Sequence, residues 1–311
     1  MEYRPLGSAG IKVSAIGLGG WQLANPLWEM HDPNEALRIV RTALDAGCNF
    51  FDTAPGYSAG RSEELLGRAL RQVRGRVVLC SKFGHTAEGE TDFRVAAVRT
   101  SIEASLQRLQ TDYLDVLLVH NPPAELLDGT RTPLYEELER LKGEGKLRSY
   151  GVSLDSACDL EKVLATTRSG VVEVLFNVFH QEPRPAFAAA RDQGVGLIVK
   201  VPLDSGWLSG KYRSDSRFTG VRDRWTAEVI ARRAALVAQF AALLPPGLTL
   251  THAALQYVLA QPEVATVIPG AKTTSQARDN FAAASAGLPA EVVQSIRALW
   301  ERELKAEPLP W

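Results

Sequence analysis

The sequence predicts an α/β protein, namely a closed (β/α)8 TIM barrel in which parallel strands alternate with helices. Short β-rich apolar runs alternate with longer stretches of helical periodicity along the whole chain. Nearly all of the short runs are apolar throughout, which is typical of parallel strands buried on both faces. An open doubly wound sheet is the alternative. A count of eight strands, with no linker and no break in composition, favours a single barrel domain over residues 1–311.

The expected strands and helices follow one another in strict order. The strands are Val13–Leu18, Asn49–Thr53, Val77–Lys82, Tyr113–Val119, Leu147–Ser153, Val171–Asn177, Val195–Val201 and Ala265–Ile268. The helices of the repeating units cover residues 34–46, 62–72, 94–109, 133–144, 156–165, 185–193 and 273–286. Asp32 and Pro33 precede the first helix, and Ser62 followed by two glutamates opens the second. Both patterns are typical helix starts.

Four segments go beyond a minimal barrel. A polar stretch rich in glycine and arginine, residues 204–225, follows the seventh strand. Helical stretches over residues 226–243 and 251–260 precede the eighth strand, and a further helix is expected over residues 289–304 near the C-terminus. Because long loops in compact domains usually have a function, we expect the loop after the seventh strand to take part in it.

Composition and charge exclude several classes of function. Thirty-five basic residues against 36 acidic ones give a formal net charge of -1, so no overall basic field exists to bind nucleic acid or an anionic membrane. The 3 cysteines and 5 histidines are scattered, which is typical of a reducing compartment and argues against a structural zinc site. No apolar run approaches the ~20 residues that span a bilayer, and residues 1–10 lack the layout of a secretory signal. We therefore expect a cytoplasmic protein.

Four titratable side chains are expected to meet at the mouth of the barrel, where the strands have their carboxyl ends. Asp52 and Tyr57 follow the second strand, Lys82 ends the third, and His120 ends the fourth. The set fits proton transfer coupled to hydride transfer, because a carbonyl that accepts hydride needs an acid at its oxygen. A tyrosine has an ordinary pKa of about 10, which a neighbouring lysine cation lowers. The aspartate would offset the desolvation of that lysine, and the histidine would orient the carbonyl or relay the proton.

A candidate phosphate site follows the eighth strand. Pro269–Thr274 opens a helix whose first backbone N–H groups attract anions, and Lys272 adds a positive charge. Residues 17–20, which read Gly-Leu-Gly-Gly, superficially resemble a dinucleotide fingerprint. The third glycine is missing there and no amphipathic helix follows, so we expect this segment to be the first barrel strand.

A series of short motifs, in family order, resembles those of aldo-keto reductases over almost the whole chain. They are Ile16–Trp21, Asn49–Ala54 with Tyr57, Arg61–Glu63 with Leu65–Gly67, Ser81–Gly84, Ser105–Leu109, Tyr113–Asp115, Gly145–Arg148 with Gly151–Ser153, and Ile268–Lys272. The resemblance implies a (β/α)8 barrel that binds a nicotinamide cofactor without a Rossmann domain. NADP is expected and NAD is the alternative. It also implies that Tyr57 is the general acid/base, that Lys82 and Asp52 tune it, and that His120 orients the substrate or relays the proton.

The resemblance also implies a set of contacts to the cofactor and to a small carbonyl compound or sugar as substrate. The cofactor contacts are Trp21, Ser153, Glu173, Asn177, Leu203, Ser205, Gly270, Lys272, Thr273, Gln276 and Asn280. Lys211 in the long loop is a further candidate for an anion contact. Candidates for aromatic walls of the substrate pocket are Trp21, Trp28, Tyr57, Phe83, His85 and Trp207. Packing in the core is the alternative for each of them, and it is the favoured one for all but Trp21 and Tyr57.

The chain departs from the family pattern at four positions. They are Leu154, Glu173, Lys200 and Gln276, where many members have asparagine, glutamine, a nicotinamide-stacking tyrosine and arginine, respectively. Phe176 and Trp207 are therefore the candidates for stacking on the nicotinamide. A 2′-phosphate would depend on Lys272 and on Arg278.

Three alternatives to plain carbonyl reduction are considered. Residues 200–206 resemble those of sugar-dehydrogenase-like members, which indicates oxidation of an aldose to its lactone. A cofactor-binding regulatory subunit, like the barrel subunits of potassium channels, is a second alternative. A metal-dependent barrel lyase is a third, but the chain lacks a cluster of carboxylates and histidines. The natural substrate, the physiological direction and the oligomeric state are left open.

Overall fold

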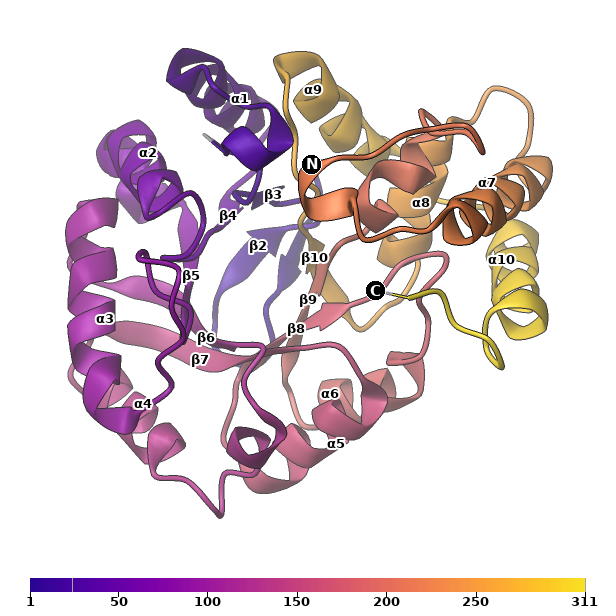
Figure 1. Cartoon of the computed structure of the whole chain (residues 1–311). Coiled ribbons are helices and arrows are strands. Elements are labelled where there is room, and N and C mark those ends of the chain that lie inside the picture. The colour runs from indigo at the N-terminus through magenta and orange to yellow at the C-terminus, as the bar shows by residue number, and fades with distance from the viewer. Residues whose placement is uncertain (24, 311) are drawn as a thin grey trace.

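Eight parallel strands form one sheet in the order β3 to β10, and helices surround it (Figure 1). The computed structural model describes residues 1–23 and 25–310. The strands are β3 (Leu18–Gly19), β4 (Phe50–Asp52), β5 (Val78–Phe83), β6 (Leu114–His120), β7 (Leu147–Leu154), β8 (Val171–Leu175), β9 (Gly196–Lys200) and β10 (Val264–Val267). The N–H of Gly17 donates to the carbonyl of Val267 at 2.8 Å, and the N–H of Val267 donates to that of Ala15 at 3.0 Å. These bonds join the two ends of the sheet, so it closes into the predicted barrel.

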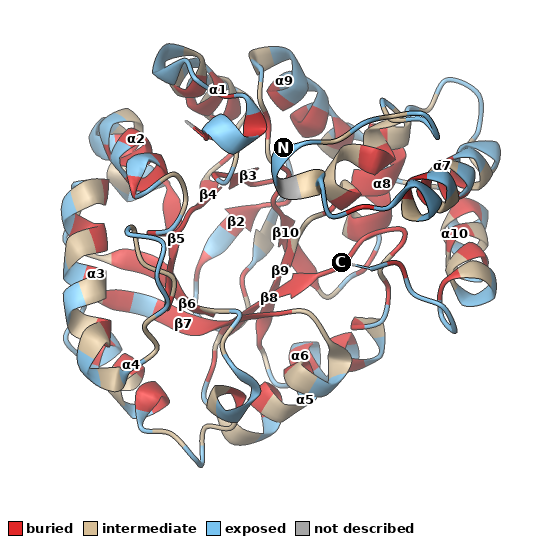
Figure 2. Cartoon of the chain, in the orientation of Figure 1, coloured by how far each residue is buried: buried red, intermediate tan, exposed pale blue. Residues whose placement is uncertain are grey.

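The predicted helices are present, with their buried faces toward the strands (Figure 2). They are α1 (Pro33–Asp45), α2 (Arg61–Leu70), α3 (Val95–Leu109), α4 (Leu134–Gly143), α5 (Ala157–Thr166), α6 (Phe187–Asp192), α7 (Ala227–Ala242), α8 (Leu250–Leu259), α9 (Thr274–Ala282) and α10 (Ala290–Glu303). In α1 the buried residues are Ala36, Ile39, Val40 and Ala43, which is the spacing of one helical face. Within residues 1–23 and 25–310, no helix is long and apolar enough to cross a membrane.

The two predicted helix starts have different outcomes. Asp32 does cap α1, because its side chain accepts the backbone N–H of Asn34 at 2.8 Å. Ser62 does not cap α2, which begins one residue earlier. The Ser62 hydroxyl is buried and donates to the carbonyl of Gly20 at 2.9 Å. It therefore ties α2 to the loop after β3.

The first predicted strand, Val13–Leu18, is divided in the structure. Its beginning belongs to β2 (Lys12–Ser14), which pairs antiparallel with β1 (Tyr3–Pro5), and only its end reaches the barrel in β3. Leu6 and Ile11 of this N-terminal hairpin are buried among apolar residues inside the barrel, near the amino ends of its strands. The hairpin therefore closes the end of the barrel opposite the mouth. One apolar run in the sequence thus forms two strands, β2, which pairs with β1, and β3, which pairs with β4.

The loop after β9 lies along one side of the barrel mouth, and we call residues 204–225 the strap. Its aromatic side chains pack together, with the ring centre of Phe218 at 4.8 Å from that of Tyr212 and 5.0 Å from that of Trp225. The guanidinium of Arg222 lies 4.5 Å from the ring centre of Trp28, in the loop after β3. The strap therefore has a small apolar core and also contacts the loop after β3.

A buried ion pair fixes the beginning of the strap. Asp204 and Arg233 of α7 are both almost fully buried and pair with each other. Arg233 also donates to the backbone carbonyl of Pro310 at 2.8 Å. The C-terminal residues run back from α10 toward the strands (Figure 1), so this one arginine joins the strap, α7 and the tail.

We expect Arg233→Ala to lower the free energy of unfolding by about 3–5 kcal/mol, because the Asp204 carboxylate would stay buried without its partner. Urea denaturation followed by circular dichroism measures the change. Arg191→Ala is the matched control, since the side chain of Arg191 is 54% exposed and its ion pairs lie at the surface. This control should shift stability by no more than ~0.5 kcal/mol. Equal losses in the two variants would contradict an anchoring role for Arg233.

Candidate active site

A cavity of about 770 Å³ opens at the carboxyl ends of the barrel strands. One end contains the predicted proton-transfer residues, and the other contains the predicted phosphate site. The predicted site residues that line it are Trp21, Asp52, Tyr57, His120, Glu173, Leu203, Ser205, Gly270, Lys272, Gln276 and Asn280. Lys82 and Ser153 lie buried beneath it, and Thr273 lies at the start of α9.

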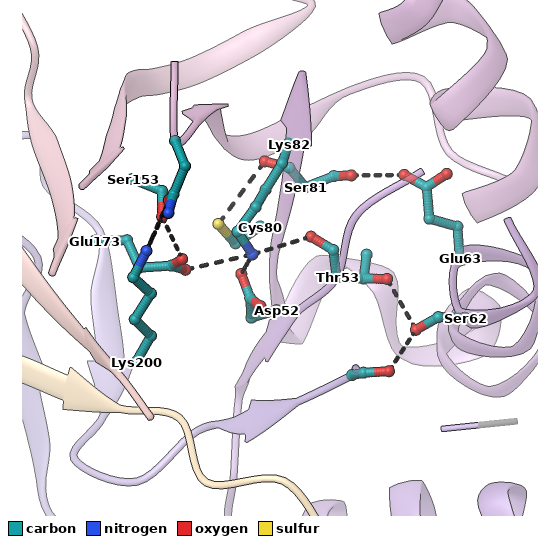
Figure 3. Close-up of polar contacts among 12 residues, drawn as sticks. Asp52, Thr53, Ser62, Glu63, Cys80, Ser81, Lys82, Ser153, Glu173 and Lys200 are labelled. Carbon is teal, nitrogen blue, oxygen red and sulfur yellow. Dashed lines mark hydrogen bonds and ion pairs between the residues drawn. The ribbon is translucent and has the colours of Figure 1, made fainter. Parts of the chain in front are cut away.

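The ammonium group of Lys82 lies at the floor of this cavity between two carboxylates (Figure 3). Lys82 is on β5 and Asp52 ends β4, so two neighbouring parallel strands bring their side chains together. The distance from Nζ of Lys82 to Oδ2 of Asp52 is 2.5 Å. On the other side, Nζ lies 3.3 Å from Oε2 of Glu173 on β8. All three side chains are almost completely buried, so the ion pairs offset their loss of hydration.

Glu173 connects this lysine to a second cation. The hydroxyl of Ser153 lies 2.8 Å from Oε1 of Glu173 and donates to it. Lys200, at the end of β9, donates from Nζ to Oγ of Ser153 at 2.8 Å and to Oδ1 of Asn121 at 2.7 Å. The same ammonium group pairs with Asp155 at 2.9 Å. The glutamate that replaces the family's glutamine therefore lies between two lysines, and charges of opposite sign alternate across the floor.

Burial and a shared cation set the pKa values of the two carboxyl groups. Desolvation raises the pKa of Asp52 to about 8, against the opposing effect of Lys82, and the charge of Glu173 contributes to the rise. Burial also disfavours the ionised form of Glu173, but Lys82 and Lys200 outweigh it and lower its pKa. The same two carboxylates overcome the desolvation of Lys82 and raise its pKa well above the ordinary value. Near neutral pH the carboxyl pair therefore carries about one negative charge beside a lysine cation.

Tyr57 and His120 stand above this floor. Nζ of Lys82 lies 5.2 Å from the ring centre of Tyr57, and the His120 ring meets Tyr57 edge-on at 5.9 Å. Burial raises the pKa of Tyr57 above its ordinary value in spite of Lys82, and the charges of Asp52 and Glu173 add to the rise. This net direction is opposite to the lowering expected from the lysine alone. The pKa of His120 is lowered well below its ordinary value by burial and by Lys82, so its imidazole is neutral.

Further rings enclose the space around Tyr57. The indole of Trp21 lies 6.3 Å from the Tyr57 ring and 5.2 Å from the indole of Trp28, measured between ring centres. His85 lies 4.8 Å from His120. Trp21, Trp28 and His85 all line the cavity, as predicted for walls of a substrate pocket. The proton-transfer candidates therefore open into a partly aromatic space.

The far end of the cavity is built around the start of α9. Thr273 is the N-cap residue, and its hydroxyl accepts the backbone N–H of Gln276 at 3.1 Å. Asn280 donates from Nδ2 to the carbonyl of Gly270 at 3.2 Å. A Cβ at Gly270 would lie 1.7 Å from Oε1 of Gln22, so a larger residue here would displace the end of that side chain. The predicted phosphate site is thus a packed turn with helical N–H groups behind it.

Cations and carboxylates compete at this helix end. Lys272 pairs with Glu29 at 2.7 Å and lowers the pKa of that glutamate. Glu35 on α1 accepts the backbone N–H of Thr274 at 2.9 Å. Lys211 of the strap also lines the cavity, and burial together with neighbouring cations lowers its pKa to about 8. A phosphate group placed here would meet cations that are close enough to repel one another, with Glu29 as the present counter-ion of Lys272.

Three of the aromatic candidates belong to the core rather than to the cavity. Trp207 is fully buried in the aromatic core of the strap, and Phe176 is fully buried against two other core rings. Phe83 is 1% exposed and packs edge-on against Phe93. None of the three lines the cavity, so they form neither its wall nor a surface for stacking. Sequence position alone could not separate aromatic rings of the core from those of the pocket.

Sequence reasoning also missed residues that the structure brings to the site. Asn121 and Asp155 closely follow strands, and this position at a strand end was the available signal. Gln22, Glu29 and Glu35 lie in no recognised motif. Gln22 lines the cavity, and Glu29 and Glu35 contact Lys272 and Thr274 at the start of α9, through the folding of the loop after β3 and of α1. Among the described residues, no group of three or more His, Cys, Asp and Glu side chains is arranged to hold a metal ion.

We expect Lys82→Met to lower the free energy of unfolding by about 3–5 kcal/mol at pH 7, because two carboxyl groups would then share a buried site without a cation. Their pKa values in the folded state would lie far above the unfolded values near ~4, so stability should fall further as the pH rises above ~4. Urea denaturation at pH 5 and pH 8 measures this.

Lys142→Met is the matched control, since the side chain of Lys142 is 43% exposed and pairs with Glu139 at the surface. It should change stability by no more than ~0.5 kcal/mol. A loss in Lys82→Met that is the same at pH 5 and at pH 8 would contradict the electrostatic explanation.

Comparisons with known proteins agree with this arrangement. The sequence model of the Aldo/keto reductase family matches residues 15–301. An L-galactose dehydrogenase of Arabidopsis thaliana is 32% identical over 97% of this chain and 95% of its own length. A probable voltage-gated potassium channel subunit beta of the same plant is 31% identical over 91% of each chain. The structure of an aldo-keto reductase from Bacillus halodurans in its holo form has a TM-score of 0.82 and 29% identity, covering 96% of both chains. The chain therefore belongs to the aldo/keto reductase family, oxidoreductases that act with nicotinamide cofactors.

Proposed function

We propose that the protein transfers a hydride between a nicotinamide cofactor and an aldehyde or ketone, or the corresponding alcohol, with Tyr57 as the general acid/base. The observation that carries this proposal is the position of Tyr57 in the cavity, beside the buried pair of Lys82 and Asp52 and edge-on to His120. When bound, the cofactor supplies the hydride to a carbonyl carbon or accepts it from an alcohol carbon.

The side chains divide the proton chemistry between them. In reduction, the hydroxyl of Tyr57 donates its proton to the carbonyl oxygen, and in oxidation the phenolate takes the proton back. Lys82 stabilises the phenolate that forms, and Asp52 holds the lysine charge in a buried position. The neutral imidazole of His120 donates a hydrogen bond to the same oxygen and orients it. The raised pKa of Tyr57 keeps its proton in place until a substrate oxygen accepts it.

The shape and charge of the cavity support a dinucleotide that extends from Tyr57 to α9. Its proposed contacts at the nicotinamide end are Trp21, Ser153 and Glu173. In the middle they are Leu203, directly before the strap, and Ser205 and Lys211 of the strap. Its proposed contacts at the adenosine end are Gly270, Lys272, Thr273, Gln276 and Asn280. We propose NADP as the cofactor, with NAD as the alternative, because Lys272 offers a cation to a 2′-phosphate at a helix start. Glu29 would have to release Lys272 for this contact.

Polar groups around Tyr57 favour an aldose or a related polyhydroxylated compound as substrate. Asn121, Asp155 and His85 line the cavity together with the indole of Trp21, which is 37% exposed. A planar ring beside several hydrogen-bonding groups suits a sugar. One matched relative is named as a dehydrogenase of L-galactose, which agrees with this substrate class. Oxidation of an aldose to its lactone removes hydride from the anomeric carbon and passes the proton of its hydroxyl to the phenolate form of Tyr57.

We expect Tyr57→Phe to lower kcat by about 10²–10⁴-fold, because the carbonyl oxygen loses its proton donor. The Kd of the cofactor should change by less than about twofold, since the binding contacts remain. Steady-state kinetics with aldehydes and aldoses and a fluorescence titration with cofactor measure the two quantities. Tyr3→Phe, on the exposed hairpin, is the control and should keep wild-type kcat.

Unchanged turnover in Tyr57→Phe would show that another group is the acid. A wild-type protein that binds cofactor but turns over no carbonyl compound or sugar would instead support the regulatory role that the name of the channel-subunit relative suggests.

We expect Glu29→Gln to increase affinity for NADP relative to NAD by about two- to fivefold, because Lys272 would lose its competing carboxylate. The two Kd values, measured by fluorescence titration at constant ionic strength, give the ratio. Glu90→Gln, an exposed residue at another part of the cavity rim, is the matched control and should leave the ratio unchanged. Equal changes for NADP and NAD in Glu29→Gln would rule out Lys272 as the contact of the 2′-phosphate.

A further inference from the structure

Glu173 is a buried carboxylate that the proposed proton transfer does not use. It is 1% exposed, and its two oxygens are held by Lys82 at 3.3 Å and by the Ser153 hydroxyl at 2.8 Å. Lys82 already has a counter-ion in Asp52 at 2.5 Å. One lysine therefore faces two carboxylates (Figure 3), where a single one would balance its charge. The further positive charge near Glu173 is Lys200, which it reaches through Ser153, but Lys200 has its own counter-ion in Asp155. The three carboxylates therefore exceed the two lysines, and a buried excess of carboxylates is costly unless another positive charge approaches.

The position of Glu173 relates it to the reacting part of a bound cofactor. Glu173 lines the cavity, and its partner Lys82 lies 5.2 Å from the ring centre of Tyr57. Hydride passes only between atoms in contact, so the nicotinamide ring must lie against the carbon whose oxygen receives the proton of Tyr57. The hydride transfer and the proton transfer therefore both take place close to Glu173. Its charge therefore acts on the nicotinamide ring rather than on the distant adenosine end.

The charge count at the floor of the cavity is negative when its carboxylates are ionised. Lys82 and Lys200 carry two positive charges, and Asp52, Glu173 and Asp155 carry three negative ones. A glutamine at position 173, as in much of the family, would make the count zero. The oxidised nicotinamide ring is a cation and the reduced ring is neutral. Because the floor is buried, one unit of charge there has a large effect on the binding of a nearby cation.

We propose that Glu173 makes the site select the oxidised, positively charged form of the nicotinamide cofactor over the reduced form, and that this selection strengthens as the pH rises. This inference rests on the proposed function and identifies the redox form that the same site takes up. The pH dependence arises because Asp52 and Glu173 cannot both ionise freely beside one lysine, and the pKa of Asp52 is raised to about 8. Loss of that last proton adds one negative charge below the ring. By linkage, the bound cation favours the deprotonated pair to the same extent.

We assign this pH dependence to the pair of Asp52 and Glu173 rather than to the groups around it. The titratable or charged groups that face the pair are Tyr57, Cys80, Lys82, His120, Asp155 and Lys200. The pKa values of Tyr57 and Cys80 are raised by burial, so both stay neutral to alkaline pH. The pKa of His120 is lowered well below its ordinary value by burial and by Lys82, so its imidazole stays neutral. Lys82, with its raised pKa, stays a cation, and Lys200 is paired with Asp155.

The test is the ratio of the Kd of reduced cofactor to that of oxidised cofactor, measured on the purified full chain by calorimetric titration at pH 6, 7, 8 and 9. In the wild type we expect oxidised cofactor to bind more tightly, and the ratio to increase by about tenfold between pH 6 and pH 9. In Glu173→Gln we expect a ratio about tenfold lower at pH 9 and nearly constant over the range. Titration of Lys211, whose pKa is lowered to about 8, cancels in the ratio because both forms carry the same phosphates.

Two controls make the result specific. Glu90→Gln removes an exposed carboxylate from the rim of the same cavity and should keep the wild-type ratio at every pH, since water screens that charge. ADP-ribose 2′-phosphate is the cofactor without its nicotinamide, and it should bind the wild type and Glu173→Gln with equal affinity. Equal affinity shows that the variant retains a folded site.

The outcomes separate this inference from the proposed function. A wild-type ratio that is below one, or that does not change with pH, overturns the inference without any variant. A Glu173→Gln protein that keeps the wild-type ratio and its pH dependence overturns it as well. Failure of the wild type to bind either form of the cofactor overturns the proposed function instead. If Glu173→Gln does not fold, the wild-type pH series alone still decides.

Discussion

A lysine ammonium group that is almost fully removed from water is stable in a protein where carboxylates surround it. In this barrel the end of β4 and the middle of β8 supply them to Lys82 on β5. The strand order places these three side chains around one point of the barrel interior, because inward-facing residues of a closed barrel converge on its axis. The charge of Lys82 then influences Tyr57 above it. Hydrogen bonds connect the second carboxylate, that of Glu173, through Ser153 to Lys200. The rest of the site is arranged around this cation.

The sequence was sufficient to predict the barrel and the residues at its strand ends. Continuously apolar runs and the alternation of elements indicate a parallel sheet, and the closing bonds between the segment before β3 and β10 confirm it as a barrel. Asp52, Tyr57, Lys82 and His120 could be placed together because a parallel barrel puts every strand's carboxyl end at the same rim. Backbone periodicity determines these positions, and it is a local property of the chain.

Other features depend on contacts between segments far apart in the sequence. Phe83 ends β5, Phe176 directly follows β8 and Trp207 lies in the loop after β9, near the same rim as the cavity residues. Only packing shows that they belong to the core. The net rise in the pKa of Tyr57 was not predicted, because the effect of one lysine could be read from the motif whereas the opposing effect of burial could not. Glu29 and Glu35 reach the start of α9 from about 240 positions away in the chain, so no local pattern could indicate them.

The N-terminal hairpin gives the barrel one sealed end and one open end. Water therefore approaches the buried charges through the mouth, and a molecule bound in the cavity excludes it from the floor. Solvent then no longer weakens the electric field of Lys82 and its carboxylates from either end of the barrel. Two antiparallel strands far from the chemistry thus determine how strongly the floor and an occupant of the cavity influence each other.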